Sequence, residues 1–419
     1  IAPDMAEACA AYTLPLVYSC ERILRVSAPG LQSVPRSTLG PLAAFNANQL
    51  SLTLNGISVP IQIAGENLLF YADTVGDRWN PTDAYVLRPE SAQYPPTVME
   101  AAQAVSALGG TGSPSAVIDR GVWRNNVLYS SLHRGFDGDH WSAGDLWIIP
   151  GGATSSSPPV NVVLNNPALN SPPNKLPPGS GAATLTFNVS PYRRVTSSPR
   201  QYNLVATVGG SKTTIAFPEF EFANPAQDWP DGISQSHTFA ANPTALSLSL
   251  AQIAGNNAQS GLLVDSIAYA RPASLALARN GAVFEGNSGQ TQYRWSGAAD
   301  GFLLYDVTNP QAPIPLTGAS PAGFTDGRGA AKRYLVTGAG FLHTPAVEVK
   351  YLQEYKNLSG VQAIYVVANS EFAGALKPLT DLRCASYKVA VVDVNAIYNR
   401  YSNSQVSADA IRNFLRDAW

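Results

Sequence analysis

Residues 361–419 read VQAIYVVANSEFAGALKPLTDLRCASYKVAVVDVNAIYNRYSNSQVSADAIRNFLRDAW, and this stretch decides the fold at the carboxyl end of the chain. Two apolar runs rich in β-branched residues, 363–367 and 388–394, are typical of strands buried on both faces of a sheet. Between them, apolar residues recur at three- and four-residue spacing, which predicts a helix with one apolar stripe: Phe372, Ala375, Leu376, Leu379 and Leu382. Ser407 begins a second predicted helix. The order strand, helix, strand, helix predicts the opening of a parallel α/β sheet with right-handed crossovers.

This α/β unit is expected to be incomplete. The pattern supplies two strands, and the sequence then stops at Trp419, in or just after a helix. Two parallel strands with open edges and uncovered faces do not make a stable domain. We therefore expect the rest of the domain to lie on a companion chain, or in a longer precursor of which this chain is one part.

Composition narrows the class of protein. Charged residues make up 13% of the 419 residues, which is about half the usual share, and the net charge is −2. A chain without a basic stripe is not expected to bind nucleic acid, and no apolar run is long enough to span a bilayer. The first residues, IAPDMAEAC, lack the pattern of an intact signal peptide, so a mature or truncated start is expected. Low charge and many turn residues favour a secreted, β-rich protein at the cell surface or outside the cell.

The expected fold class is mainly β, and the chain divides into four segments. Residues 1–120 form an antiparallel β domain, in which Asn55-Gly56 predicts a hairpin turn. Short alternating runs over residues 121–273 predict a β-sandwich of the jelly-roll or Ig-like type. Residues 274–356 are a further β-rich segment, whose end from residue 351 links to the next part. Residues 357–419 are the incomplete α/β (βαβα) unit.

The three cysteines are Cys9, Cys20 and Cys384. Cys9 and Cys20 are spaced to form a disulfide that closes a small loop, and two unpaired thiols explain the sequence equally well. Cys384 lies near the end of the first predicted helix with no base beside it, which favours a buried structural cysteine over a catalytic one.

The densest polar chemistry lies in residues 133–144, HRGFDGDHWSAG. Three carboxylates in or next to this loop, Asp137, Asp139 and Asp145, are a candidate calcium site, although the bidentate Glu of a calcium loop is missing. His133 and His140 with an aspartate suggest a metal or acid–base site instead. A solvated turn explains the same residues, and we favour that interpretation.

Three segments together resemble the amino-terminal region of gingipain-like cysteine peptidases. They are LLFYADTVGDRWNPTDAYVL at 68–87, FLLYDVTNPQAPIPL at 302–316, and the βαβα pattern that begins IYVVANSEFAGALKPLTDLRC at 364. The resemblance implies a secreted endopeptidase with a caspase-like α/β domain, in which a histidine activates a cysteine thiolate. In the family both residues follow the segment where this sequence ends. No histidine or cysteine of this chain matches them, so no catalytic residue is carried over.

Two functions from different classes follow. In the first, the chain is the non-catalytic part of a gingipain-like cysteine endopeptidase, including its prodomain-like β domain, and serves folding, latency or substrate positioning. Its partners are then the rest of the peptidase domain or a companion chain, and protein substrates of the parent enzyme. In the second, the chain is an extracellular binding or structural protein, such as an adhesin, a surface-layer protein or a filament subunit. Self-association is compatible with both.

Overall fold

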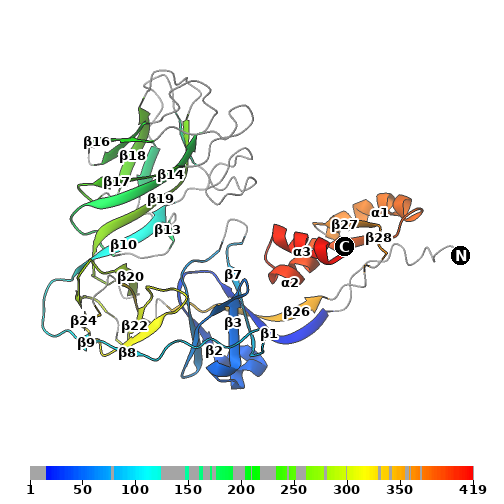
Figure 1. Cartoon of the computed structure of the whole chain (residues 1–419), viewed down its shortest axis with the longest axis horizontal. Coiled ribbons are helices and arrows are strands. Elements are labelled where there is room, and N and C mark those ends of the chain that lie inside the picture. The colour runs from blue at the N-terminus through cyan, green and yellow to red at the C-terminus, as the bar shows by residue number, and fades with distance from the viewer. Residues whose placement is uncertain are drawn as a thin grey trace. The chain divides into compact units, whose positions relative to one another are not determined.

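The computed structural model describes residues 16–418 except for 77–79, 124–146, 151–159, 164–169, 172–175, 192–202, 209, 218–232, 243–244, 252–260, 278–280, 299, 329–331, 339–341, 354–357, 359 and 369. The chain divides into two compact units. Unit 1 consists of Ile1–Glu100, Pro310–Pro313 and Leu342–Trp419, and unit 2 of Ala101–Asn309 and Ile314–Phe341. Each unit is assembled from segments that are distant in sequence (Figure 1). The division into four segments remains a prediction.

The first part of unit 1 is a pair of antiparallel sheets, which we call the N-terminal β domain (residues 16–100 with strand β26). The five-stranded sheet has the order β26 (Ala346–Gln353), β1 (Leu16–Val26), β7 (Asp83–Pro89), β3 (Leu50–Leu54) and β4 (Ile57–Val59). The three-stranded sheet has the order β2 (Gly30–Pro35), β6 (Asn67–Ala72) and β5 (Ile61–Ala64), and two short 3-10 helices cover Arg36–Ala44 and Ala47–Gln49. Leucines and aromatic residues of both sheets form one buried core, among them Leu24, Leu52, Leu68, Phe70 and Tyr85. Burial of these side chains stabilises the domain through the hydrophobic effect.

The hairpin predicted at Asn55-Gly56 is confirmed. Strands β3 and β4 pair from Leu52–Val59 to Leu54–Ile57 around these two residues. Asn55 has φ 51° and Gly56 has φ 82°. Positive φ at both central positions is what a type I′ turn requires, and Asn-Gly meets it at little cost.

Strand β26 completes the N-terminal β domain from a distant part of the chain. Ile23 of β1 lies opposite Glu348 and Leu24 opposite Val347, while the other edge of β1 pairs with β7. A salt bridge of 3.1 Å between Arg25 and Glu348 joins the same two strands. The interpretation of the chain from residue 351 as a linker is wrong at its start, because β26 extends to Gln353.

Unit 2 is β-rich throughout its described residues. Its main sheet has eleven strands, with the order β17 (Ile233–Phe239), β14 (Ala183–Pro191), β19 (Gly261–Ser274), β10 (Ala116–Trp123), β20 (Gly281–Glu285), β25 (Arg333–Thr337), β22 (Leu303–Asp306), β23 (Ile314–Thr317) and β8 (Gln103–Ala104), while β11 (Trp147–Pro150) pairs with β19 and β13 (Asn170–Ser171) with β10. A second sheet contains β12 (Val160–Val163), β18 (Ala245–Ala251), β15 (Asn203–Val208) and β16 (Ser211–Ala216). A third contains β21 (Gln292–Arg294), β24 (Gly323–Thr325) and β9 (Ser106–Ala107). Alternate residues of β14, Leu185, Phe187 and Val189, are fully buried, as expected for strands packed on one face.

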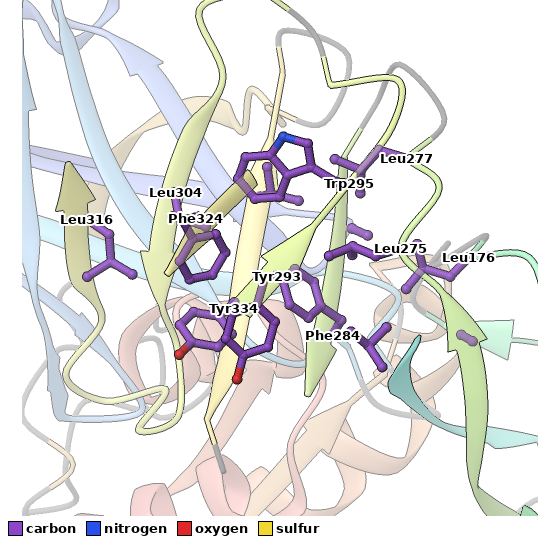
Figure 2. Close-up of a cluster of buried hydrophobic side chains, with 14 of the residues drawn as sticks. Leu176, Leu275, Leu277, Phe284, Tyr293, Trp295, Leu304, Leu316, Phe324 and Tyr334 are labelled. Carbon is purple, nitrogen blue, oxygen red and sulfur yellow. The ribbon is translucent and has the colours of Figure 1, made fainter. Parts of the chain in front are cut away.

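An aromatic cluster forms one core of unit 2 (Figure 2). Tyr293 stacks on Phe324 with ring centroids 4.8 Å apart, and Tyr334 meets the edge of Tyr293 at 4.9 Å. Phe284 and Trp295 complete the ring contacts. Tilted and edge-to-face packing of this kind adds to the stabilisation that burial already supplies.

Charged groups cap one side of this cluster. Asp306 accepts hydrogen bonds from Lys332 (2.7 Å) and from the Thr308 hydroxyl (2.6 Å). Asp326 accepts one from Nε of Arg328 at 2.7 Å. Burial raises the pKa of Asp306, but the bonds from Lys332 and Thr308 outweigh that effect and hold the pKa below its usual value. These carboxylates are therefore ionised and paired around neutral pH.

The predicted fold class is confirmed. The described residues are mainly strands in several antiparallel sheets, followed by a short α/β unit at the carboxyl end.

Candidate functional site: a two-stranded α/β unit

The α/β unit, residues 361–418, is built on two parallel strands. Strand β27 (Ala363–Val367) pairs with β28 (Val389–Asp393) over five residues, from Ala363–Val389 to Val367–Asp393. Helix α1 (Ser370–Cys384) is the crossover between them. The predicted strand, helix and strand are therefore confirmed in type and position. The sheet contains only these two strands among the residues that the structure describes.

Two further helices follow β28 in this unit (Figure 1). Helix α3 (Ala408–Ala418) was predicted, and helix α2 (Val394–Ser402) was not. Together they supply Ile397, Ala410 and Phe414 to a small core that also contains Ala390 and Val392 of β28. Because apolar side chains of the strands pack against both helices, one face of the two-stranded sheet is covered.

The apolar stripe of α1 is not covered by the described part of the chain. Phe372 is 57% exposed and Leu382 is 71% exposed, and Leu379 also lies on the surface. In a layered α/β domain, such a helix face packs on neighbouring strands. Three apolar side chains of α1 are therefore exposed in the described part of the chain.

The carboxyl end of β28 carries Asp393, at the edge where α/β sheets usually bind ligands. Its side chain accepts a hydrogen bond of 2.8 Å from the backbone N–H of Asn395 and caps α2. This is the standard role of an aspartate before a helix, since it satisfies a donor that has no partner within the helix. Asp393 therefore orients α2. The pattern Asp393-x-Asn395 before Ala396 and Ile397 is the sequence signal from which α2 could have been predicted.

The histidines and cysteines of the described residues lie on different elements of the fold. His237 lies on β17 in unit 2, with its ring 4.8 Å from that of Phe239. His343 lies in unit 1, where its backbone bonds to Leu31 and Ser33 and burial lowers the pKa of its ring. Cys20 lies on β1 and Cys384 at the end of α1.

The cysteine predictions need correction. Cys20 is a free and exposed thiol, which does not agree with a Cys9–Cys20 disulfide; Cys9 itself lies outside the described residues. Cys384 is disulfide-bonded, which agrees with a structural rather than a catalytic cysteine, but it is half-buried and not buried as expected. An oxidised cysteine is typical of proteins from compartments outside the cytosol.

The candidate calcium residues Asp137, Asp139 and Asp145 lie outside the described residues, as do His133 and His140. In the part that is described, no three His, Cys, Asp or Glu side chains gather closely enough to hold a metal ion. The calcium site stays a prediction.

Comparison with known proteins relates the α/β unit to a family of peptidases. Residues 357–419 match the model of Peptidase family C25. The chain contains a gingipain-like peptidase region. We call residues 357–419 the peptidase region; the expected resemblance is confirmed for this part of the chain.

The fold of the whole chain resembles that of a solved structure, dimeric latent PorU from Porphyromonas gingivalis. The TM-score is 0.55 at 14% identity, over 99% of this chain and 40% of that chain. The chain therefore spans less than half the length of that protein, and at this identity the likeness shows the fold alone. A match to the structure of the T13 IBDV viral particle covers 99% of this chain and 95% of that one at 11% identity, but its TM-score of 0.12 carries no argument. No curated protein sequence matches the chain significantly.

Among the described helices, none combines the length and the apolar character needed to cross a membrane.

Proposed function

We propose that this chain is the amino-terminal portion, without the catalytic dyad, of a secreted gingipain-like cysteine endopeptidase that acts outside the cell or at its surface. Its β-rich parts serve folding, latency or substrate positioning. The reactive histidine and cysteine come from polypeptide beyond this sequence, whether continuous with it or on a companion chain. The observation that carries the proposal is the two-stranded sheet β27–β28 within a region that matches Peptidase family C25.

The physical argument rests on what a two-stranded parallel sheet lacks. Parallel sheets are stable when further strands pair with their edges and helices cover both faces. Here the exposed Phe372, Leu379 and Leu382 of α1 leave apolar surface in water, which is unfavourable in proportion to its area. Additional strands beside β27 or β28 would pair the open edges and cover this stripe. The proposal thus explains both features by one missing part.

Latency and self-association receive support from the structural relative, which is described as dimeric and latent. A fold shared across nearly the whole of this chain makes the same two properties reasonable proposals here. Protein substrates and the remaining catalytic domain are then the partners of the parent enzyme.

The test uses a thiol-directed covalent inhibitor on the product of the complete reading frame. We expect one cysteine outside residues 1–419 to be labelled rapidly, because a neighbouring imidazole keeps it as a thiolate. The exposed thiol of Cys20 is removed beforehand by Cys20→Ser, so that slow surface alkylation does not obscure the result.

The alternative function is an extracellular binding or structural protein, such as an adhesin, a surface-layer protein or a filament subunit. It is favoured by the lack of a histidine–cysteine pair among the described residues and by the large proportion of β-sheet. In the same experiment it predicts that no cysteine outside this sequence is activated, and that result would rule out the peptidase proposal.

A further inference from the structure

The loop between α2 and α3, residues 403–407, is held by the N-terminal β domain, which belongs to the same unit. The key side chain is Asn80, which is only 8% exposed. Its Nδ2 donates a hydrogen bond of 3.1 Å to the carbonyl oxygen of Val406, and its Oδ1 accepts one of 2.8 Å from the N–H of Val406. One side-chain amide thus satisfies both backbone groups of one residue, as a neighbouring strand would.

Two further hydrogen bonds join the same parts. The side chain of Gln405 donates to the carbonyl oxygen of Thr82 at 2.7 Å, and Nη2 of Arg25 donates to the carbonyl oxygen of Asn403 at 3.0 Å. Most of these contacts use backbone groups of the loop or the domain, so they depend on the conformation of the loop more than on its side chains. We call Arg25, Asn80 and Thr82, with the loop that they bind, the clamp.

The clamped loop has a backbone conformation that side chains disfavour. Asn403 has φ 52° and Ser404 has φ 63°, both in the left-handed region. Asparagine tolerates this region better than serine does, and two consecutive non-glycine residues there are uncommon. The N–H of Ser404 bonds to the carbonyl oxygen of Tyr398 at 2.9 Å, which closes the end of α2. The loop is therefore held from both sides, by the end of α2 and by the clamp.

Helix α3 starts directly after this loop. It supplies Ala410 and Phe414 to the small core that it shares with α2 and β28. A helix of eleven residues is marginally stable by itself in water, so α3 depends on contacts with its surroundings. The clamp fixes the residue just before Ser407, whose hydroxyl accepts a hydrogen bond from the N–H of Ala410 at 3.2 Å.

We propose that the clamp is a switch through which the N-terminal β domain controls the order of the peptidase region. When the clamp is closed, the loop stays in its left-handed conformation and α3 is anchored on α2 and β28. When the β domain is moved away or removed, the loop relaxes and α3 loosens. A strained segment that a second domain holds in place has two states, held and relaxed, and such segments can act as switches. This inference rests on the proposed function for its biological role, but the coupling itself is a property of this chain alone.

The test is amide hydrogen exchange of the intact chain, compared with an Asn80→Ala variant. We expect the Val406 amide, and the Ala410 amide that bonds to Ser407, to exchange at least tenfold faster in the variant, while those of β28 change little. Asn80→Asp keeps the acceptor for the Val406 N–H but sets a carboxylate oxygen against the Val406 carbonyl in place of the amide donor, so its protection should lie between those of asparagine and alanine. The matched control is Asn46→Ala, the same substitution at an exposed site of the same domain, which should leave the loop unchanged. Equal protection of Val406 in Asn80→Ala and in the unmodified chain would overturn the proposal.

Three further variants show whether the effect is confined to the loop or comes from unfolding of the whole β domain. Gln405→Ala removes the bond to Thr82 from the side of the loop, and faster exchange there with unchanged β3 and β7 supports the clamp. Ser404→Gly, made in the Asn80→Ala background, should restore part of the protection because glycine adopts the left-handed conformation at no cost. Ser404→Ala should not. If glycine restores nothing, strain plays no role and the switch is wrong. None of these measurements involves a reactive cysteine, so their failure would leave the proposed peptidase function untouched, and failure of that function would leave them standing.

Discussion

The hydroxyl of Tyr334 donates a hydrogen bond of 2.7 Å to Oδ2 of Asp326, and both side chains are buried beside the aromatic cluster of unit 2. Burial by itself raises the pKa of Asp326, but the hydrogen bonds from Arg328 and Tyr334 outweigh burial and hold the pKa at about 2. An ordinary aspartate in an unfolded chain has a pKa of about 3.9. Because the pKa of the folded state is the lower one, this interaction stabilises unit 2 at any pH above about 4, and the stabilisation is lost as the pH falls toward 2.

Replacement of Asp326 by asparagine should therefore destabilise unit 2 at pH 7 by about 1–3 kcal/mol, the usual loss for a buried hydrogen bond to a charged group. The difference from the unmodified chain should shrink as the pH is lowered from 4 to 2. Urea unfolding at several pH values, followed by amide exchange in β24 and β25, measures both effects. The control is Asp381→Asn, which breaks an exposed pair with Lys377 and should change stability by less than about 0.5 kcal/mol. A loss that is equally large at pH 2.5 would contradict the assigned pKa.

Truncation of Phe324 to alanine should cost unit 2 about 3–5 kcal/mol, because the ring is fully buried and a cavity remains where it stacked on Tyr293. Leu303→Ala is a suitable control, since Leu303 lies partly exposed on β22 and should cost less than about 1 kcal/mol. Denaturant unfolding followed by amide exchange in β24 and β25, which contain Phe324 and Tyr334, distinguishes the two variants. Similar losses for both would mean that the cluster is not a rigid core.

Replacement of Leu382 by serine should reduce self-association of the isolated chain and its binding of a dye specific for apolar surfaces. Leu382 is 71% exposed on the uncovered stripe of α1, so a polar side chain there removes apolar surface from water without loss of packing. Ile57→Ser is the matched control, because Ile57 is 61% exposed on a separate hairpin. Light scattering over a concentration series provides the measurement. If both variants behave alike, the stripe of α1 is not an interaction surface.

The cysteines should react unequally. The chain holds three, of which Cys20 is free and Cys384 is in a disulfide. Peptide mapping without reduction should show Cys20 alkylated, and the peptide that contains Cys384 cross-linked to a second cysteine-containing peptide. Detection of Cys20 in any disulfide of the freshly purified protein would contradict this assignment.

Residues 361–419 expressed alone should be unfolded or aggregated. Their sheet has only two strands, and the apolar stripe of α1 is exposed to solvent. Without residues 1–360, the loop between α2 and α3 also loses its hydrogen bonds to Asn80. Circular dichroism during heating should show no cooperative transition. A sharp, reversible melt of this fragment would count against the view that the α/β unit is incomplete.

Local patterns predicted local structure well in this chain. Asn55-Gly56 predicted its hairpin because two residues alone determine that turn, and the alternation of strand and helix predicted β27, α1, β28 and α3. Helix α2 was not predicted, because it starts at Val394 without a break after an apolar strand, and only the capping bond of Asp393 separates the two. Periodicity shows which residues are apolar, but not where one element ends and the next begins.

Relationships between distant segments could not be read from the sequence. The pairing of β1 with β26 joins residues more than 300 positions apart. The sequence of β26, AVEVKYLQ, predicts a strand but does not indicate which strand it pairs with. The spacing of apolar residues in α1 was predicted, but only the structure shows that no described residue covers Phe372, Leu379 and Leu382 fully. The clamp was missed for the same reason, since Asn80 and Val406 have no individual sequence signal.

The return of the chain to β1 also sets the order of events during synthesis. Strand β1 emerges from the ribosome early and finds β7 soon afterwards, but β26 follows only after all of unit 2 has been made. Until β26 has been synthesised, one edge of β1 in the N-terminal β domain stays unpaired, while unit 2, which is inserted within unit 1, can fold completely. A nascent chain released before residue 353 would thus carry a finished unit 2 inside an unfinished host, and would be a natural target for chaperones that bind exposed strands.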